Sequence, residues 1–450
     1  MCMALYTRSE TNMSLSCVRR SRPFRTSSSS RRSLSLTMWS VKSTVRAGRF
    51  ACRQISVEAG NVVFGRSGKQ FHPMWLRERC VGPASVQQET LQAFRQPHEF
   101  PADLGIVSAQ VSPLSDSGVA PRTLTVGFTD GHVSVFDADA LNNEADDFAA
   151  CGIQQSDIKC PDVFMWDKST GSDVPRLSYL DVASGQPEVL LKLTTHLLRY
   201  GHVIVEGVPS RDGEVAAFAR VVSEYPSVRP TNWGPVFNVR SFPDAALKDL
   251  SYTAEKLSPH VDNPYRNPNP GFQFLHVLEN ECASGESLAV DGFMAAEQLR
   301  LESPAFFKTL CQTDVRWEND GGDRSTALIH FAPMLEVDKS SGKLTQIRYS
   351  PKSGGYCPAL SMEEADTFFQ ARRRFAELLH AESNMVRFQM VKGDLWIFNN
   401  LRLLHGRSEF NPHEGFRHLQ GSYVDADAVT SAFFRAKYAL KASSDSDSDA

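Results

Sequence analysis

The sequence predicts a mainly β protein with some α-helix, in which a double-stranded β-helix, or jelly roll, spans residues 175–437 and a small β-rich domain spans residues 55–150. Three observations predict this fold. From residue 230 to about residue 427, short apolar runs separated by turns dominate the chain, and few segments there have a helical period. The N-terminal part of the chain contains alternating apolar and polar runs as well. With 450 residues, of which 41% are hydrophobic, the chain can form two or three domains with a sizeable core.

Residues 1–54 differ in composition from the rest of the chain. They contain 11 arginines and lysines, many serines and the single acid Glu10. An arginine-rich, serine-rich segment with few acids is typical of an organelle transit peptide. We therefore predict a disordered targeting segment and a mitochondrial location, with plastid or cytoplasm as alternatives. A plain basic tail, or a true start at Met38, would account for the same composition.

The predicted N-terminal domain has alternating segments at residues 56–65, 71–80 and 122–137. The sequence TDGH at residues 129–132 separates two alternating runs, which predicts a β-hairpin. Residues 150–184 show little periodicity and are predicted to be a linker.

The next segments predict two helices followed by strands. In residues 186–201 apolar side chains recur at helical spacing and stop at Gly201, which predicts a helix; residues 214–225 predict a second one. One more helix is expected at 361–383, where SMEE forms a capping-box pattern. Strands are predicted at residues 202–209, 271–279, 286–293, 327–338, 343–351 and 394–406. Residues 441–450 are predicted to be a disordered acidic tail.

Composition and charge argue against several classes of partner. The net charge is -4, and no basic patch with interleaved aromatics occurs beyond the N-terminal segment, so a nucleic acid is not expected as partner. No apolar run approaches the roughly 18 residues of a membrane span, so no membrane is expected either. The nine cysteines show no C-x-x-C spacing, which favours free thiols in a reducing compartment.

His260 and Asp262 stand two residues apart in a predicted strand, where side chains at that spacing point to the same side. A non-haem Fe(II) site uses two histidines and one carboxylate and leaves positions open. His405, placed just after a buried-looking strand, is the candidate for the second histidine. Arg417 follows twelve residues later and offers a guanidinium fork that suits a dicarboxylate. Taken alone, H-x-D is a weak signal, and an Asp-paired core histidine is the alternative.

Four segments together resemble the gamma-butyrobetaine dioxygenase branch of the Fe(II)/2-oxoglutarate oxygenases, which are taurine dioxygenase-like enzymes. They are HVDNPYRNPNPGFQFLH (260–276), SGESLAVDGF (284–293), NNLRLLHGR (399–407) and RHLQGSYVDAD (417–427). The resemblance, which runs from Phe71 to Phe434, implies that His260, Asp262 and His405 hold Fe(II). It also implies that Arg417 binds the distal carboxylate of the cosubstrate 2-oxoglutarate, assisted by Ser287. O2 would complete the reaction, which yields succinate and CO2; a structural zinc on the same ligands is the alternative.

The same resemblance implies a small trimethylammonium substrate, with gamma-butyrobetaine, which would be hydroxylated to carnitine, as the first candidate. Trp233, Phe237, Tyr252 and Tyr423 align with aromatic residues that surround the cation; the alternative for each is a core aromatic. For the anionic end, relatives place asparagines near Asp249 and Ser350, whereas this chain has Ser350 followed by Lys352. That departure keeps 2-(trimethylammonio)ethylphosphonate and trimethyllysine as alternatives, the latter disfavoured by HVDNPYR. A non-catalytic jelly-roll protein that binds quaternary ammonium is the alternative from another class.

In the N-terminal domain, relatives often bind zinc with three cysteines and one histidine. Here Cys80 and His132 occupy two of those positions, but Gly82 and Ser85 replace the other thiols. Because two ligands do not close a tetrahedral site, no structural zinc is predicted. The resemblance also implies a homodimer.

Overall fold

The structure, a computed structural model, describes the greater part of the chain after residue 54. The described residues are 55–58, 60–64, 69–90, 92–112, 122–138, 141, 160–222, 228–240, 253–320, 327–354, 360–411 and 413–448. The predicted targeting segment 1–54 lies outside them, as does Tyr252.

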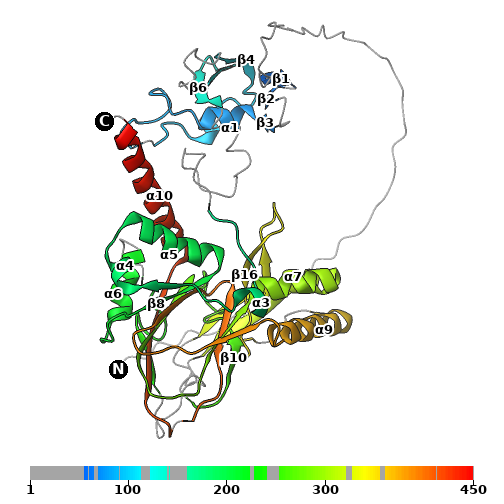
Figure 1. The fold of residues 1–450 in the computed structure, drawn as a ribbon. Coiled ribbons are helices and arrows are strands. Elements are labelled where there is room, and N and C mark those ends of the chain that lie inside the picture. The colour runs from blue at the N-terminus through cyan, green and yellow to red at the C-terminus, as the bar shows by residue number, and fades with distance from the viewer. Residues whose placement is uncertain are drawn as a thin grey trace, which may run out of the picture.

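Two antiparallel-dominated sheets face each other in the main domain, which confirms the predicted jelly roll (Figure 1). The first sheet has the order β7-β8-β18-β11-β20-β9 and the second the order β10-β19-β12-β17. The strands of the first sheet are β7 (Arg176–Ser178), β8 (His202–Glu206), β18 (Leu395–Asn399), β11 (Phe272–Asn280), β20 (Arg417–Val424) and β9 (Phe237–Arg240). Those of the second are β10 (Leu257–His260), β19 (Leu403–Arg407), β12 (Ser287–Asp291) and β17 (Met385–Phe388).

Helices cover the outer face of each sheet. Against the six-stranded sheet lie α4 (Tyr179–Ala183), α5 (Pro187–Arg199), α6 (Glu214–Val222) and the start of the long helix α10 (Ala426–Ser448). Against the four-stranded sheet lie α7 (Gly292–Glu302), α8 (Pro304–Gln312) and α9 (Met362–Leu379), and α7 runs beside α9 (Figure 1). The inner faces of the sheets meet in a third cluster that includes Trp396 and Phe398.

Side chains along strand β11 alternate between the helix-covered face of the sheet and the space between the two sheets. Phe272 and Phe274 pack under the helices, while Gln273 and Leu275 face the space between the sheets. This alternation follows from the two-residue period of a strand. The hairpins β13–β14 (Asp314–Asn319, Leu328–Pro333) and β15–β16 (Leu335–Val337, Leu344–Ile347) extend the second half of the domain.

The N-terminal domain has its own small core. It contains the sheet β1-β2-β3 (Ile55–Glu58, Asn61–Phe64, Lys69–Phe71) and the sheet β4-β5-β6 (Ile106–Val111, Thr123–Phe128, Val133–Asp137), with helix α1 (Pro73–Glu78) and the 3-10 turn η1 (Pro97–Glu99). Strands β5 and β6 pair across residues 129–132, which confirms the predicted hairpin. Their buried side chains join those of β2 and α1 in one cluster.

Several predicted elements are wrong. Residues 73–78 form helix α1 rather than β structure, because Pro73 stands in the first turn and the side chain of His72 accepts from the Met74 amide. Residues 160–184 of the predicted linker are ordered: they form α3 (Lys168–Gly171), β7 and α4, and Trp166 is buried. Helices α7 and α8 were not predicted, and 394–406 contains two strands with a turn between them.

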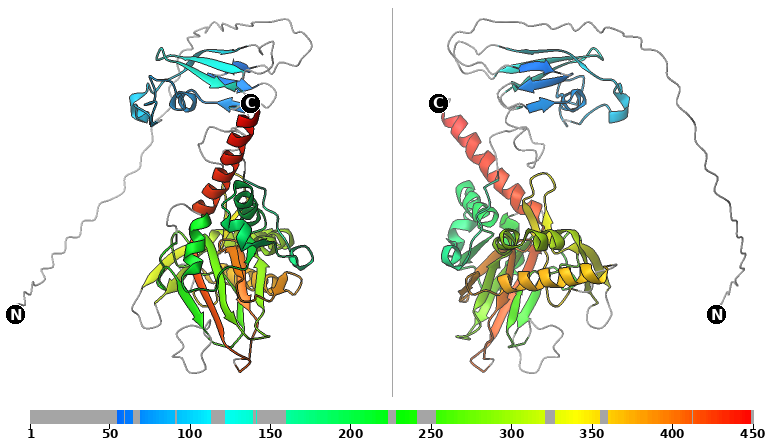
Figure 2. Two further views of the ribbon diagram at one scale, coloured as in Figure 1. Left: turned by 60° about the vertical axis from the view of Figure 1, so that its left-hand side comes forward. Right: turned by 90° about the vertical axis from the view of Figure 1, so that its right-hand side faces the viewer.

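Helix α10 continues to Ser448, so the prediction of a disordered tail is wrong for residues 441–448. Elongating an existing helix adds one hydrogen bond for each residue fixed, which favours continuation over a fresh start. Figure 2 shows this helix projecting beyond the sheets. Among the described residues, no helix has the length and apolarity needed to cross a membrane.

Candidate active site

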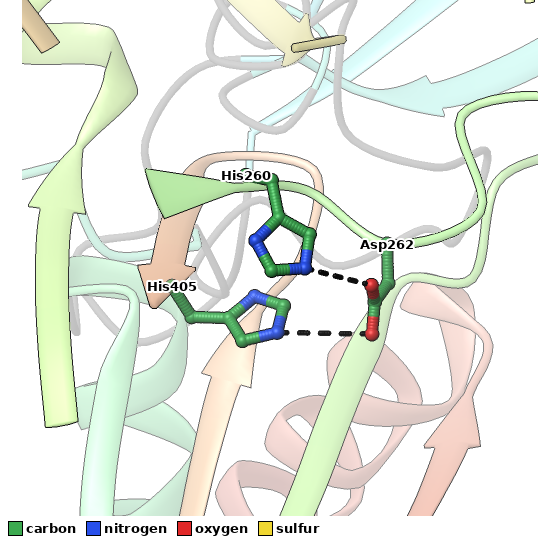
Figure 3. Close-up of side chains that lie close together, drawn as sticks. All are labelled: His260, Asp262 and His405. Atoms are coloured by element: carbon green, nitrogen blue, oxygen red, sulfur yellow. Dashed lines mark ion pairs between the residues drawn. The ribbon is translucent and has the colours of Figure 1, made fainter. Parts of the chain in front are cut away.

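His260, Asp262 and His405 converge between the two sheets, and each offers one ligand atom within 4.8 Å of the others (Figure 3). The two histidines are register partners on β10 and β19, and their ring centroids lie 4.4 Å apart. Asp262 Oδ1 lies 3.3 Å from His260 Nε2, and Asp262 Oδ2 lies 3.7 Å from His405 Nε2. Within the described part of the chain, no other group of this kind was found.

The backbone positions of Asp262 and His405 differ from the predicted ones. Strand β10 ends at His260, so Asp262 lies in the turn beyond the strand rather than on its same face. His405 lies within β19 instead of after a strand. Pairing of β10 with β19 brings the histidines together, and the turn returns the carboxylate toward them.

The ring of His260 is oriented by its own strand. His260 Nδ1 lies 2.8 Å from the carbonyl oxygen of Ser258, to which it donates, so Nε2 is the ring nitrogen that faces Asp262. Orientation of this kind is usual for metal-binding histidines. Burial, followed by the neighbouring His260, lowers the pKa of His405 to about 3, which keeps its imidazole neutral at physiological pH. Two imidazoles and a carboxylate fit the donor set of a non-haem Fe(II) site.

Asp262 is held by four hydrogen bonds from other parts of the fold. Its Oδ2 accepts from Gln273 Nε2 at 2.9 Å and from the hydroxyl of Tyr423 at 2.7 Å. Its backbone N–H donates to Asn400 Oδ1 at 2.8 Å, and its carbonyl accepts from Asn400 Nδ2 at 3.0 Å. Burial opposes ionisation, but the adjacent His405 and His260 lower the pKa of the carboxyl group overall. The carboxylate is therefore oriented before any ligand arrives.

A pair of buried arginines lies at the same cavity. Arg417 is the first residue of strand β20. Burial lowers the pKa of its guanidinium to about 10, so it remains a cation at neutral pH. Arg407 Nη2 donates to the carbonyls of Thr253 and Glu255 at 2.6 and 2.8 Å, which secures the chain just before β10. Ser287, the first residue of β12, is buried in the same lining. No sequence signal had singled out Arg407.

Aromatic side chains border the other part of the site. Phe237 and Tyr423 stack with centroids 5.2 Å apart and ring planes inclined by 24°. A side chain at Gly421, the register partner of Phe237, would collide with the Phe237 ring, so glycine permits this stacking. Trp233 lines the same cavity, and so does Tyr265, which the sequence analysis did not identify. Burial and the charge of Asp262 raise the pKa of Tyr265 to about 12.

One cavity of about 240 Å³ joins these groups. The metal-ligand candidates, both arginines and the aromatic residues all line it. Ser350 is buried in its wall, and Lys352 is exposed at its lining, where its charge contributes to lowering the pKa values of Asp262 and His405. A single compartment can thus hold a metal ion, a dicarboxylate and a small cation.

In the N-terminal domain, Cys80 and His132 do lie together. His132 Nε2 is 3.2 Å from Cys80 Sγ and 3.4 Å from Ser85 Oγ. The buried Arg77 guanidinium donates to Ser85 and pairs with Asp130 at 3.1 Å. The guanidinium of Arg77 and the hydroxyl of Ser85 therefore lie close to this cysteine and histidine. Among the described residues, no group of three metal-binding side chains includes Cys80.

Comparisons with known proteins identify the family. A model of the taurine catabolism dioxygenase TauD, TfdA family matches residues 168–423. The chain belongs to this family. It is 32% identical to gamma-butyrobetaine dioxygenase of Pseudomonas sp. (strain AK-1), over 80% of this chain and 89% of that protein. It is 28% identical to gamma-butyrobetaine dioxygenase of Homo sapiens (69% and 78%) and 25% identical to trimethyllysine dioxygenase of Neurospora crassa (81% and 80%).

Membership of this family confirms the predicted enzyme class: the protein is a 2-oxoglutarate-dependent dioxygenase that uses Fe(II) and O2. Solved structures resemble it more distantly. AAD-2 in complex with Mn(II) and N-oxalylglycine aligns with a TM-score of 0.44 at 12% identity, covering 58% of this chain and 96% of that one. An asparagine oxygenase in complex with Fe(II), 3-hydroxyasparagine and succinate aligns with a TM-score of 0.40 at 17% identity, covering 54% and 83%.

Proposed function

We propose that this dioxygenase hydroxylates a small trimethylammonium compound, with gamma-butyrobetaine, converted to carnitine, as the favoured substrate. The observation that carries the proposal is the stacked pair Phe237 and Tyr423 directly beside the candidate metal ligands, with Trp233 in the same cavity. A permanent cation without hydrogen-bonding groups is held by aromatic faces, at about 0.5–2 kcal/mol each. The relatives named gamma-butyrobetaine dioxygenase support the same assignment.

Each group of residues has a role in this proposal. His260, Asp262 and His405 would hold Fe(II), which, when bound, would supply the oxidising chemistry of a 2-oxoglutarate-dependent dioxygenase. Arg417, buried and cationic, binds the distal carboxylate of 2-oxoglutarate through its guanidinium, and the Ser287 hydroxyl assists.

Trp233, Phe237 and Tyr423, which line the same cavity as the candidate metal ligands, would hold the substrate cation. The predicted contribution of Tyr252 lies outside the described residues. Because the cavity lining is largely buried, a bound substrate would exclude bulk water from the site, which limits side reactions.

The anionic end of the substrate is assigned to the part of the lining that contains Ser350 and Lys352. Lys352 is close enough to the site for its charge to act on Asp262 and His405, which supports an anion beside it. A lysine also suits a phosphonate, so 2-(trimethylammonio)ethylphosphonate is the second candidate substrate. Trimethyllysine, the substrate named for more distant relatives, carries an amino group and a carboxylate at its far end. A non-catalytic binder of quaternary ammonium is disfavoured, because it requires neither metal ligands nor Arg417.

A substrate panel with the purified full-length protein tests the proposal. We expect gamma-butyrobetaine to stimulate succinate release from 2-oxoglutarate, and its neutral isostere, in which carbon replaces the quaternary nitrogen, to do so far less. Including the phosphonate and trimethyllysine, and repeating the panel with Lys352→Ala, identifies the anionic end. If no betaine raised succinate release above the background without substrate, the proposal would be abandoned.

Two further assignments extend the proposal. Residues 1–54 would direct the protein to mitochondria, which a fluorescent fusion of that segment tests against a fusion that lacks it. The protein would form a homodimer, which light scattering measures directly; a monomer mass at micromolar concentration would contradict it.

A further inference from the structure

We propose that Gln273 and Tyr423 are positioning residues that restrict Asp262 to binding the metal through one oxygen, Oδ1. Both donate hydrogen bonds to the same carboxylate oxygen, Oδ2, at 2.9 Å and 2.7 Å. A carboxylate oxygen offers about two lone-pair sites, so these two donors occupy those of Oδ2. Oδ1 remains, and it is the oxygen nearer to His260 Nε2, at 3.3 Å.

The sheet places the two donors as a matched pair. Gln273 on β11 and Tyr423 on β20 are direct register partners, so their side chains leave neighbouring strands on the same face. Both side chains are almost completely buried, at 1% and 3% exposure. Rigid strands and dense packing therefore hold the two donors at a fixed separation, and Asp262 Oδ2 lies where both can reach it.

Gln273 and Tyr423 are the hydrogen-bond donors, and Asp262 is the acceptor. An ionised carboxylate only accepts hydrogen bonds, so the amide of Gln273 must present its NH2 group to Asp262. Its Oε1 is then buried and has no hydrogen-bond partner among the described residues. Hydrogen bonds to a metal-binding carboxylate commonly determine its orientation.

The functional consequence concerns the number of open positions at the metal. Two histidines and one carboxylate oxygen leave three positions of six, enough for a chelating 2-oxo acid and O2. A carboxylate that turned to bind with both oxygens would occupy one of those three. Engaging Oδ2 with two donors opposes that turn, so Gln273 and Tyr423 keep the third position available.

Tyr423 also connects this function to the proposed substrate site, since its ring stacks on Phe237. The hydroxyl of Tyr423 thus donates a hydrogen bond to a candidate metal ligand, while its ring forms one side of the proposed cation site. The inference about Asp262 does not require the substrate assignment; it rests on the metal assignment of the proposed function.

The test uses full-length Tyr423→Phe and Gln273→Leu with Tyr265→Phe as matched control. Tyr265 lines the same cavity, but its hydroxyl donates to Asn263 Oδ1 at 2.7 Å rather than to Asp262. Metal affinity is measured by anaerobic titration with Co(II), whose visible spectrum also reports coordination number. Affinity for 2-oxoglutarate is then measured by calorimetry at saturating Co(II), so no betaine is involved.

We expect Tyr423→Phe and Gln273→Leu each to lower metal affinity about 10- to 100-fold. Their Co(II) spectra should change, and their affinity for 2-oxoglutarate should fall even when metal is saturating, whereas Tyr265→Phe should match the wild type. Wild-type metal affinity in both variants would overturn the proposal. So would weaker metal binding with an unchanged spectrum and unchanged 2-oxoglutarate affinity. Asp262→Ala separates the assignments: if it binds Co(II) normally, the metal site itself is wrong.

Discussion

Replacing Asn400 by alanine removes the side chain that ties Asp262 to the rest of the fold. Asn400 is fully buried, and its amide makes three hydrogen bonds to backbone groups: two to Asp262 and one, at 3.1 Å, to the carbonyl of Pro270. Each such bond contributes about 1 kcal/mol net, and leaving its buried partner unsatisfied costs about 1–3 kcal/mol. Loss of all three should therefore lower the free energy of unfolding by about 3–5 kcal/mol.

Urea unfolding of the metal-free protein, followed by tryptophan fluorescence, measures this loss. Asn399→Ala is the matched control, because the neighbouring Asn399 makes one side-chain hydrogen bond, to the Leu401 amide at 2.9 Å, and should cost only about 1 kcal/mol. Metal affinity should fall as well for Asn400→Ala, since Asp262 would lose two backbone anchors. If both variants lost the same stability, the reasoning about Asn400 would be refuted.

Four further predictions follow from buried charges and from the site. Arg402→Met should cost about 3–5 kcal/mol in urea unfolding, because it leaves Asp291 buried without its ion-pair partner. Burial lowers the pKa of His202 from 6.5 to about 3, so as the pH falls the unfolded chain takes up this proton before the folded protein does. The free energy of unfolding should therefore fall between pH 6.5 and pH 3, by on the order of 3 kcal/mol at pH 4. Urea unfolding at a series of pH values measures this fall, which should be smaller in His202→Phe. Arg417→Ala should raise the KM for 2-oxoglutarate roughly 100-fold, consistent with about 3 kcal/mol for a charge-assisted contact; an unchanged KM would refute its role. Phe237→Leu should weaken binding of trimethylammonium substrates about 3- to 30-fold and of the neutral isostere much less, by competition assays.

The candidate metal ligands could be predicted from the sequence because the segments that contain them resemble one family of oxygenases. His260 and Asp262 stand two residues apart, which alone is a weak signal, and the order of the four resembling segments adds His405. The residues that orient them could not be found in this way. Gln273 and Asn400 reach Asp262 from 11 and 138 residues away, and no spacing distinguishes them from ordinary amides. Their function depends on strand register, which the pattern of apolar residues indicates only in part.

Helices α5 and α9, which have an apolar stripe, were predicted, whereas α7, in which the stripe is weak, was missed. Helix α5 has Leu193 and Leu197 on one buried face, and α9 opens with a complete Ser361 capping box. In α7, by contrast, several buried residues are small, including Ala295 and Ala296, and the large apolar Leu301 is exposed, so the sequence shows no clear 3.6-residue period of large apolar side chains. Its N-cap, Asp291, is also the last residue of strand β12. The segment around Trp166 is held by single contacts, such as the hydrogen bond from the Trp166 amide to Asp291. Such contacts leave no periodic pattern in the sequence, so the segment was predicted to be a linker.

The central claim is that His260, Asp262 and His405 together bind the ferrous ion that a 2-oxo acid then chelates. Anaerobic addition of Fe(II) and 2-oxoglutarate should give the visible charge-transfer band of an iron-bound 2-oxo acid in the wild type. His405→Ala, if folded as judged by circular dichroism, should lose that band at the same concentrations. A band of undiminished intensity in this variant would contradict the account, because the iron would then be bound elsewhere.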